Sequence, residues 1–388
     1  MGQLKILTAG ESHGRALVGI IEGMPAGVRI AQERIDAQLR KRQGGAGRGG
    51  RMKIEHDRAQ ILSGVRFGLT LGSPISLVIE NRDWENWRER MGVFDGADPS
   101  PVTVPRPGHA DLAGALKYGH TDLRNVIERA SARETALRVA IGSVVQQLLD
   151  AFSIWIGSHV VRIHTATASE SLRLLFDRSA PGGSSEVREM VSRADASEVR
   201  TSDREAEKAM KCCISDAAAA GDTVGGMFEV VALSVPVGLG SYADLERRLD
   251  AQIAGAFMGI PGVKAVEIGL GVECAGRPGS EVHDPILPGE GLRRGSNRAG
   301  GIEGGVGNGE PILVRATMKP IPTLQRPLPS VDLSTGEAAP AHVERSDVCA
   351  VPAAAVVGEA MLAIVLGRAL CEKYGGDSLD EMMKNFRS

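Results

Sequence analysis

The sequence lacks the features of a protein stabilised by disulfides or by structural zinc. Its five cysteines are an odd number and include no CxxC pair, which argues against a disulfide framework and against a structural zinc site. Disulfides are rare in cytosolic proteins. We therefore expect all five cysteines to be reduced packing residues, and no bound metal.

Long hydrophobic runs are also missing. No uninterrupted stretch of about 18 apolar residues, the length that spans a bilayer, occurs in the chain, and the N-terminus has no apolar signal core. We therefore expect a cytoplasmic protein with no membrane partner. The net charge is only −3, so the chain has no global basic field of the kind that attracts nucleic acid.

What is present is the composition of a globular protein with a large core. Hydrophobic residues make up 43% and charged residues 24% of the 388 residues. The length alone favours two domains without excluding one large unit. The 49 glycines indicate many turns and close backbone approaches.

Hydrophobic periodicity predicts alternating strands and long helices. We expect strands at residues 4–9, 74–80, 154–163, 223–237, 263–272 and 311–318, and helices at 31–43, 122–152, 203–220, 242–258 and 350–374. Residues 83–107 and 277–309 are expected to be long loops, and residues 172–200 a variable surface segment. The helix at 122–152 is apolar nearly all round in its second half, which predicts burial between two layers.

The strands favour an α+β fold. Several alternate polar and apolar residues, which suits antiparallel sheets packed on a helical layer better than a doubly wound parallel sheet. Each half of the chain, about 1–200 and 201–388, has strands, a long buried helix and a basic or glycine-rich loop. This similarity between the two halves indicates an internal duplication, although no repeat of 20–50 residues is visible.

The first candidate site is the motif GESHG at residues 10–14. It follows a predicted strand and presents Ser12 and His13 between glycines, in a tight loop where backbone can approach a ligand. The pattern predicts a functional histidine without fixing its role as base, ligand or neither.

A basic segment follows the first predicted helix. The sequence RKRQGGAGRGGR at residues 40–51 combines five cations with five glycines. Arginine binds phosphate and carboxylate bidentately, so we interpret the segment as a flexible basic lid for a small, multiply charged anion. A solvated charge run remains an alternative, as does an RGG-like nucleic-acid segment, although the aromatic residues typical of the latter are absent. It is not a Walker loop, because no Gly-Lys-Ser/Thr ends it.

Two further segments place arginine near other polar side chains. In RPGHAD at residues 106–111, a turn carries Arg106 and His109. In RASARET at residues 129–135, Arg129 and Arg133 share a helix face. A structural histidine, and arginines that bridge to neighbouring glutamates, are the alternatives.

The C-terminal half adds two weaker signals. The glycine-rich stretch at 300–309 and the sequence KPIPT at 319–323 either form turns or bind the phosphate of a cofactor. In RSDVC at 345–349, Asp347 either caps the last long helix or handles a proton beside Arg345.

These segments, in this order, resemble the chorismate synthase family. The resemblance runs from GESHG through RASARE to RSD and covers essentially the whole chain. It implies one domain over residues 1–388, a β-α-β sandwich with a central helical layer between antiparallel sheets, and a homotetramer. It also implies conversion of 5-enolpyruvylshikimate 3-phosphate to chorismate and phosphate by an anti 1,4-elimination that requires reduced FMN.

The resemblance also implies roles for individual residues. His13 would be the general acid for the departing phosphate, His109 would stabilise the anionic reduced flavin, and Asp347 would draw a proton from the flavin. The anions of the substrate, and NADP if the enzyme reduces its own flavin, would be bound by Arg42, Arg48, Arg51, Arg106 and Arg133. The flavin would be contacted by Arg129, Ala130, Ser131, Pro261, Gly262, Gly304, Lys319, Pro320, Ile321, Pro322, Thr323 and Arg345, with Lys319 and Thr323 at its phosphate.

One position departs from the family pattern. Where the family commonly has Asn-Ala or Gln-Ala, this chain has Pro261 and Gly262. Backbone contacts to a flavin survive such a change, whereas a side-chain amide contact does not. We therefore expect a weaker or differently seated flavin at this point.

Two other functions compete with this interpretation. One is a noncatalytic binding protein that keeps the arginine-lined pocket, and the other is a flavin-free lyase or isomerase. The chain shows no GxGxxG at a strand-helix junction, so no separate nicotinamide domain is indicated. The flavin would be reduced either by this protein with NADPH or by an external flavin reductase.

Overall fold

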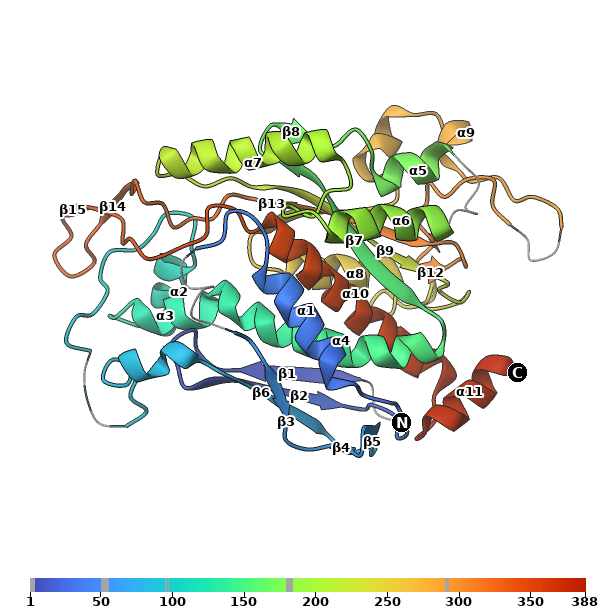
Figure 1. Ribbon diagram of the computed structural model, residues 1–388, viewed down its shortest axis with the longest axis horizontal. Coiled ribbons are helices and arrows are strands. Elements are labelled where there is room, and N and C mark those ends of the chain that lie inside the picture. The colour runs from blue at the N-terminus through green and yellow to red at the C-terminus, as the bar shows by residue number, and fades with distance from the viewer. Residues whose placement is uncertain (1–3, 50–55, 95, 97, 179–183, 290–292) are drawn as a thin grey trace.

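The computed structural model describes residues 1–388 except 1–3, 50–55, 95, 97, 179–183 and 290–292. Two antiparallel sheets enclose a layer of helices, and further helices cover the outer face of the second sheet (Figure 1). The α+β class and the central helical layer expected from the sequence are confirmed.

The first sheet has four strands in the order β1-β2-β6-β3, with all neighbours antiparallel. These strands are β1 (Lys5–Ala9), β2 (Ala16–Glu22), β3 (Ala59–Ile61) and β6 (Ile75–Glu80). Alternate side chains such as Leu17, Ile21 and Leu77 are buried against the helices. The alternation in the sequence therefore encodes a sheet with one covered face.

The second sheet has five strands in the order β10-β13-β9-β7-β8. These strands are β7 (Trp155–Ile163), β8 (Ala166–Thr167), β9 (Gly226–Leu233), β10 (Val263–Ile268) and β13 (Ile312–Met318). In β9, Phe228 and Val230 belong to the main core, whereas Val231 and Leu233 belong to a smaller cluster on the opposite face. Both faces of this sheet are covered, so its strands are apolar on both sides.

The central layer contains α1 (Gln32–Gln43), α4 (Thr135–Ala151) and α10 (Val351–Tyr374). Helix α10 packs on α4 and on strands β7 and β9. By length and composition α10 could span a membrane, but 94% of its most apolar window is buried inside the protein. Glu359 and Arg368 lie within this helix, so its sequence is not an uninterrupted apolar run.

Two predictions of secondary structure were wrong. Residues 122–152 do not form one helix: α3 (Arg124–Ala130) and the 3-10 helix η3 (Ala132–Glu134) precede α4, because Ser131 is extended with ψ 141°. Residues 172–200 are not a variable surface segment. They form α5 (Leu172–Arg178) and α6 (Ser184–Asp195), and Val187 and Val191 pack on the second sheet.

The remaining elements connect or flank these layers. Helix α8 begins at Leu249 rather than at residue 242, and β10 ends at Ile268 rather than at residue 272. The long loops contain short elements of their own. The other elements are β4 (Val65–Arg66), β5 (Leu69–Thr70), η2 (Arg82–Asn86), α2 (Asp111–Tyr118), α7 (Arg204–Ala219), α8 (Leu249–Met258), η4 (Gly271–Gly276), α9 (Gly279–Val282), β11 (Ile302–Glu303), β12 (Val306–Gly307), β14 (Pro329–Val331), β15 (Ala338–Pro340) and α11 (Leu379–Arg387).

All five cysteines are free thiols. Cys349 and Cys371 are buried, and desolvation raises the pKa of each thiol to about 11. Cys212 is exposed, so the expectation that every cysteine packs in the interior is wrong for this residue.

Candidate active site

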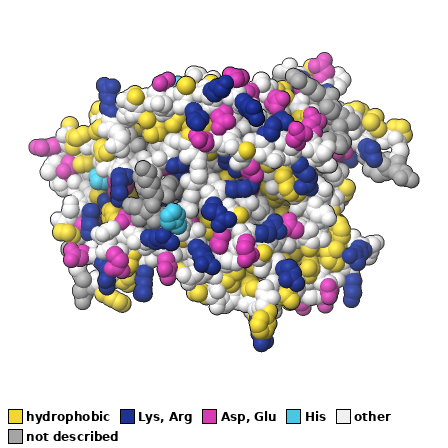
Figure 2. All heavy atoms as spheres, in the orientation of Figure 1, with side chains coloured by type: hydrophobic (Ala, Val, Ile, Leu, Met, Phe, Trp, Pro, Cys, Tyr) yellow, Lys and Arg dark blue, Asp and Glu magenta, His cyan; other side chains and the backbone are white. Residues whose placement is uncertain are grey.

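A cavity of about 640 Å³ lies at the N-terminal end of α10, where Ala350, Ala353, Ala354 and Val357 form part of its wall. Most of the predicted site residues meet there although they come from distant segments. Those that line the cavity are His13, Arg42, Arg48, Arg106, His109, Ala130, Ser131, Arg133, Pro261, Gly262, Lys319, Pro320, Ile321, Pro322, Thr323, Arg345 and Asp347. On the face shown in Figure 2, Lys and Arg side chains are interspersed with Asp and Glu.

Among the described residues, two of the predicted ones, Arg129 and Gly304, do not line the cavity. The guanidinium of Arg129 donates to the backbone oxygen and the hydroxyl of Thr8, at 3.0 and 2.9 Å. Gly304 lies in the turn between β11 and β12, where its carbonyl accepts from Arg248 at 3.3 Å. Arg51 lies outside the described residues. The flavin and substrate contacts assigned to these three remain predictions.

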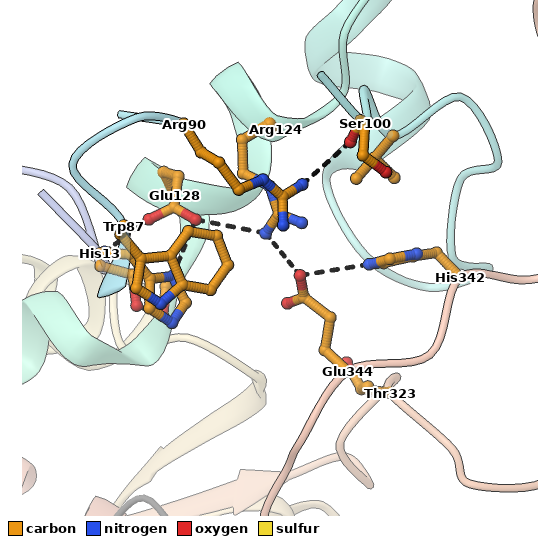
Figure 3. Close-up of polar contacts among 12 residues, drawn as sticks. His13, Trp87, Arg90, Ser100, Arg124, Glu128, Thr323, His342 and Glu344 are labelled. Carbon is orange, nitrogen blue, oxygen red and sulfur yellow. Dashed lines mark hydrogen bonds and ion pairs between the residues drawn. The ribbon is translucent and has the colours of Figure 1, made fainter. Parts of the chain in front are cut away.

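His13 occupies the loop between β1 and β2. Gly10 has a φ of 107°, and a Cβ there would lie 2.4 Å from the Ala16 oxygen, so the tight turn requires glycine. Nδ1 of His13 lies 2.9 Å from Oε1 of Glu128, and its backbone N–H donates to Oε2 at 2.6 Å. The imidazole stacks on Trp87 with ring centroids 3.9 Å apart (Figure 3).

Glu128 belongs to a chain of alternating charges. Nη1 of Arg124 lies 3.3 Å from Glu128 and 2.5 Å from Glu344, which His342 also contacts at 3.2 Å (Figure 3). Burial favours protonated carboxyls, but the hydrogen bonds and charge of His13, with Arg124, hold the pKa of Glu128 below its usual value. His342 and Arg124 outweigh burial in the same way and lower the pKa of Glu344 to about 2.

A second histidine is held by a carboxylate as well. Nδ1 of His109 lies 2.5 Å from Oδ1 of Asp111, and Nε of Arg106 donates to Oδ2 of Asp111 at 2.8 Å. Asp111 is fully buried, yet the hydrogen bonds from His109 and Arg106 overcome desolvation and hold the pKa of its carboxyl well below its usual range. Arg106 also donates to the hydroxyl of Thr323 at 2.8 Å, which joins two predicted segments.

Two buried arginines contact the same carboxylate at another wall of the cavity. Arg133 donates to Asp57 at 2.5 Å, and Arg42 lies 3.5 Å from the same carboxylate. Desolvation, assisted by Arg48 and Arg133 and opposed by Asp57, lowers the pKa of Arg42 to about 9. The guanidinium therefore stays charged at neutral pH and shares the Asp57 carboxylate with Arg133, which suits a further anionic partner.

The basic segment after α1 is held against the residues that precede α10. Nη1 of Arg48 lies 2.6 Å from Oδ2 of Asp347, and the backbone N–H of Gly49 donates to Oδ1 at 2.6 Å. Val348 donates its backbone N–H to Gly47 at 2.8 Å. Asp347 is therefore not the N-cap of α10, a position that Ala350 occupies. Backbone groups of Gly47 and Gly49 thus join the segment to residues 347 and 348, and its role as a lid stays a prediction.

The segment at 319–323 packs against Pro261 and Gly262, the two residues that depart from the family pattern. Lys319 donates its backbone N–H to the Gly262 oxygen at 2.9 Å and its Nζ to the Gly108 oxygen at 2.5 Å. Gly262 has a φ of 85°, a conformation that few other residues adopt. Pro261 and Gly262 therefore line the cavity with backbone and ring carbons but with no side-chain amide.

Sequence reasoning missed several residues of the site. Trp87 is one of two tryptophans in the long loop at 83–107, and Glu128 immediately precedes the RASARET motif. Arg124 lies one helical turn before Glu128, and Glu344 immediately precedes Arg345. Each of these residues lies close to a predicted motif in the sequence, which was a signal that could have identified it. Together, however, the four residues form no common sequence pattern. Within the described ranges, no three His, Cys, Asp or Glu side chains gather as a metal site requires.

Comparisons with known proteins agree on one family. A family model described as chorismate synthase matches residues 4–371. The chain is 54% identical to the chorismate synthase of Aquifex aeolicus over 99% of this chain and 96% of that protein, and 54% identical to that of Geobacter sulfurreducens over 99% and 97%. A crystal structure of a chorismate synthase superposes with a TM-score of 0.79 at 44% identity and covers 100% of this chain and 97% of that one.

Proposed function

The chain belongs to the chorismate synthase family, and we propose that the arginine-lined cavity is its active site. Members of this family are carbon–oxygen lyases that catalyse the final step of the shikimate pathway, the elimination of phosphate from 5-enolpyruvylshikimate 3-phosphate to give chorismate. The observation that carries the assignment is one cavity lined by several buried arginines and by two histidines, each held by a carboxylate.

The arginines bind the anionic groups of the substrate. The substrate carries one phosphate and two carboxylates, and Arg42, Arg133 and Arg48 present guanidinium groups at one wall of the cavity. Nη1 of Arg42 is buried and makes no hydrogen bond among the described residues, and its ion pair with Oδ2 of Asp57 is long, at 3.5 Å. Arg106 and Arg51 belong to the same proposed set, which would also bind NADP if the protein reduces its own flavin.

His13 donates a proton to the departing phosphate. Its Nδ1 is occupied by Glu128, so the other ring nitrogen, Nε2, is the one available to a substrate oxygen. A positioned general acid contributes typically about 10²–10⁴-fold to a rate.

Reduced FMN is the cofactor that we propose for this site. The cavity volume of about 640 Å³ lies within the usual range of cofactor sites, and the apolar walls from Ile127, Met318 and Val357 suit a flat ring system. When bound, the reduced flavin supplies electron density and a proton acceptor at the end of the substrate opposite the phosphate.

Residues of this chain would hold the cofactor from several sides. His109 would stabilise its negative charge, and Asp347 would accept a proton at its carboxylate. The remaining proposed contacts are Ala130, Ser131, Pro261, Gly262, the segment 319–323 and Arg345 on the cavity wall, with Arg129 and Gly304 outside it.

An anaerobic assay with and without reduced FMN tests this function. We expect release of phosphate from 5-enolpyruvylshikimate 3-phosphate only when reduced FMN is present. Turnover without flavin would contradict the flavin mechanism, and no turnover with flavin would favour a noncatalytic binding protein. A second assay with NADPH and oxidised FMN distinguishes a chain that reduces its own flavin from one that depends on an external flavin reductase.

The assembly and location follow from the same family membership as proposals. The main hydrophobic core includes residues from Leu4 to Met382, which supports one domain over residues 1–388. We also propose a homotetramer in the cytoplasm and an internal duplication that divides the chain at about residue 200. Size-exclusion chromatography with light scattering tests the tetramer.

A further inference from the structure

Glu128 holds His13 by both its side chain and its backbone. Oε1 lies 2.9 Å from Nδ1, and Oε2 accepts from the backbone N–H at 2.6 Å. The side chain of Glu128 is 1% exposed and that of His13 is 13% exposed. Among the described residues, no protein group hydrogen-bonds Nε2 of His13. The carboxylate therefore determines which ring nitrogen is available in the cavity.

Aromatic packing restricts the same imidazole. Trp87 stacks on it at an interplanar angle of 19°. The guanidinium groups of Arg90 and Arg124 lie over the Trp87 ring, 5.0 and 5.1 Å from its centroid (Figure 3). The stack fixes the plane of the imidazole, and the hydrogen bond to Glu128 favours one of the two orientations that the ring can take in that plane.

Arg124 is shared unequally between two carboxylates. Its Nη1 lies 2.5 Å from Glu344 and 3.3 Å from Glu128 (Figure 3). Glu344 therefore takes the shorter contact, and Oε1 of Glu128 remains close to His13. Without Glu344, Arg124 would compete with His13 for that oxygen. Arg124 still helps to keep Glu128 ionised, because its positive charge lies 3.3 Å from Oε1, the same oxygen that faces the imidazole.

We propose that Glu128 is a positioning residue for the reaction, which keeps a proton on Nδ1 of His13 and directs Nε2 into the cavity, and that Glu344 assists by drawing Arg124 away. The inference deepens the proposed acid role of His13 and rests on it. In the step itself, the proton leaves Nε2 for an oxygen of the departing phosphate. The imidazole is left neutral with its proton on Nδ1, and Glu128 stays ionised throughout.

The tautomer of His13 can be measured in the protein without substrate. Solid-state ¹⁵N spectra of histidine-labelled protein, with His13 assigned by difference from His13→Ala, report which ring nitrogen carries the proton. We expect Nδ1–H in the neutral form of the wild type. In Glu128→Gln we expect a shift toward Nε2–H, because the amide can donate to Nδ1. A wild-type His13 protonated on Nε2 alone would overturn the proposal.

Kinetics provide a readout that a purely structural role would not produce. We expect Glu128→Gln to lower kcat by about 10–100-fold, since the acid is present but wrongly oriented, with KM changed by less than about threefold. Glu134→Gln is the matched control, because Glu134 is equally part of this segment and 7% exposed but contacts Thr8 and Arg138 rather than His13. Its kcat should remain within about twofold of wild type.

A second variant keeps the proposal testable if Glu128→Gln does not fold. Glu344→Gln acts from the more exposed end of the chain of charges, and we expect a smaller loss of kcat with a partial change of tautomer. Wild-type kcat and wild-type tautomer in both variants would overturn the proposal. Failure of the wild type to release phosphate with reduced FMN would instead overturn the proposed function, while the tautomer measurement would still decide how Glu128 acts on His13.

Discussion

Arg48 and Asp347 lie 2.6 Å apart although 299 residues separate them in the sequence. The contact joins the basic segment after α1 to the residues that precede α10, and the Gly49 N–H on the same carboxylate reinforces it. A cation proposed for the substrate and a carboxylate proposed for proton transfer are thus partners in the resting protein. An anion that binds Arg48 will compete with Asp347 for it.

Loss of Arg48 should weaken substrate binding. We expect Arg48→Ala to raise the KM for 5-enolpyruvylshikimate 3-phosphate about tenfold or more, because a charge-assisted contact is removed. Steady-state assays with reduced FMN measure this change. Arg58→Ala is the control, since the Arg58 side chain is 74% exposed and contacts Asp36 only at 3.8 Å. An unchanged KM in Arg48→Ala would exclude this segment from the substrate site.

Loss of His13 should affect chemistry more than cofactor binding. We expect His13→Ala to lower turnover roughly 10–10³-fold, because the leaving phosphate loses its proton donor. Fluorescence titration should show FMN binding close to that of wild type. Impaired flavin affinity with normal single-turnover chemistry would instead assign His13 to the cofactor.

Anions should stabilise the protein through Arg42. The pKa of Arg42 falls from 12.5 to about 9 in the folded protein, chiefly because of burial. A folded-state pKa below the unfolded value means that the charged group costs stability at every pH below about 9, and a bound anion offsets this cost. We expect inorganic phosphate at pH 7 to raise the Tm of the wild type by preferential binding to the folded state.

The variant Arg42→Met isolates this effect. It removes the buried charge while retaining an unbranched apolar side chain of suitable length. We expect a smaller phosphate-dependent shift in Tm than in wild type, measured by differential scanning calorimetry against chloride at equal ionic strength. An equal shift in both proteins would place the phosphate elsewhere.

Acid should remove the stabilisation that Glu344 provides. Its pKa is lowered from 4.5 to about 2 in the folded protein, so its contribution is complete above pH 4.5 and is lost as pH falls through about 2. We expect the difference in free energy of unfolding between wild type and Glu344→Gln to be constant above pH 4.5 and to shrink below it. Urea denaturation at several pH values measures this difference, and a difference that grows on acidification would contradict the assignment.

A side chain at Gly142 should destabilise the crossing of α4 and α10. A Cβ there would lie 2.4 Å from Cβ and 2.5 Å from Cα of Ala360, so the two helix backbones would have to separate. We expect Gly142→Ala to cost about 1–3 kcal/mol of unfolding free energy. Gly255→Ala in α8 is the control, because a Cβ there meets nothing within 4 Å, and it should stabilise by up to about 1 kcal/mol. Thermal denaturation compares the two variants, and equal Tm values would contradict the close approach.

The sequence predicted secondary structure best where local periodicity and burial agree. The helix expected at 350–374 begins at Val351 and ends at Tyr374, and the strand expected at 311–318 is β13. Prediction failed at Ser131, where an extended residue interrupts an apolar helix. The Ser131 hydroxyl accepts from the Arg133 N–H and donates to Ser12 at 3.1 Å. The second of these contacts comes from another segment, so no local pattern could reveal the break.

By itself the sequence determined the chemical types at the site: a histidine between glycines, clustered arginines and the order of motifs that identifies the family. Only the tertiary structure decided which residues these side chains contact. His13 meets Glu128 across 115 residues, and Arg106 meets Thr323 across 217. The physical reason is that periodicity reports only which face of an element is buried, whereas the partner of a charge depends on how distant elements pack.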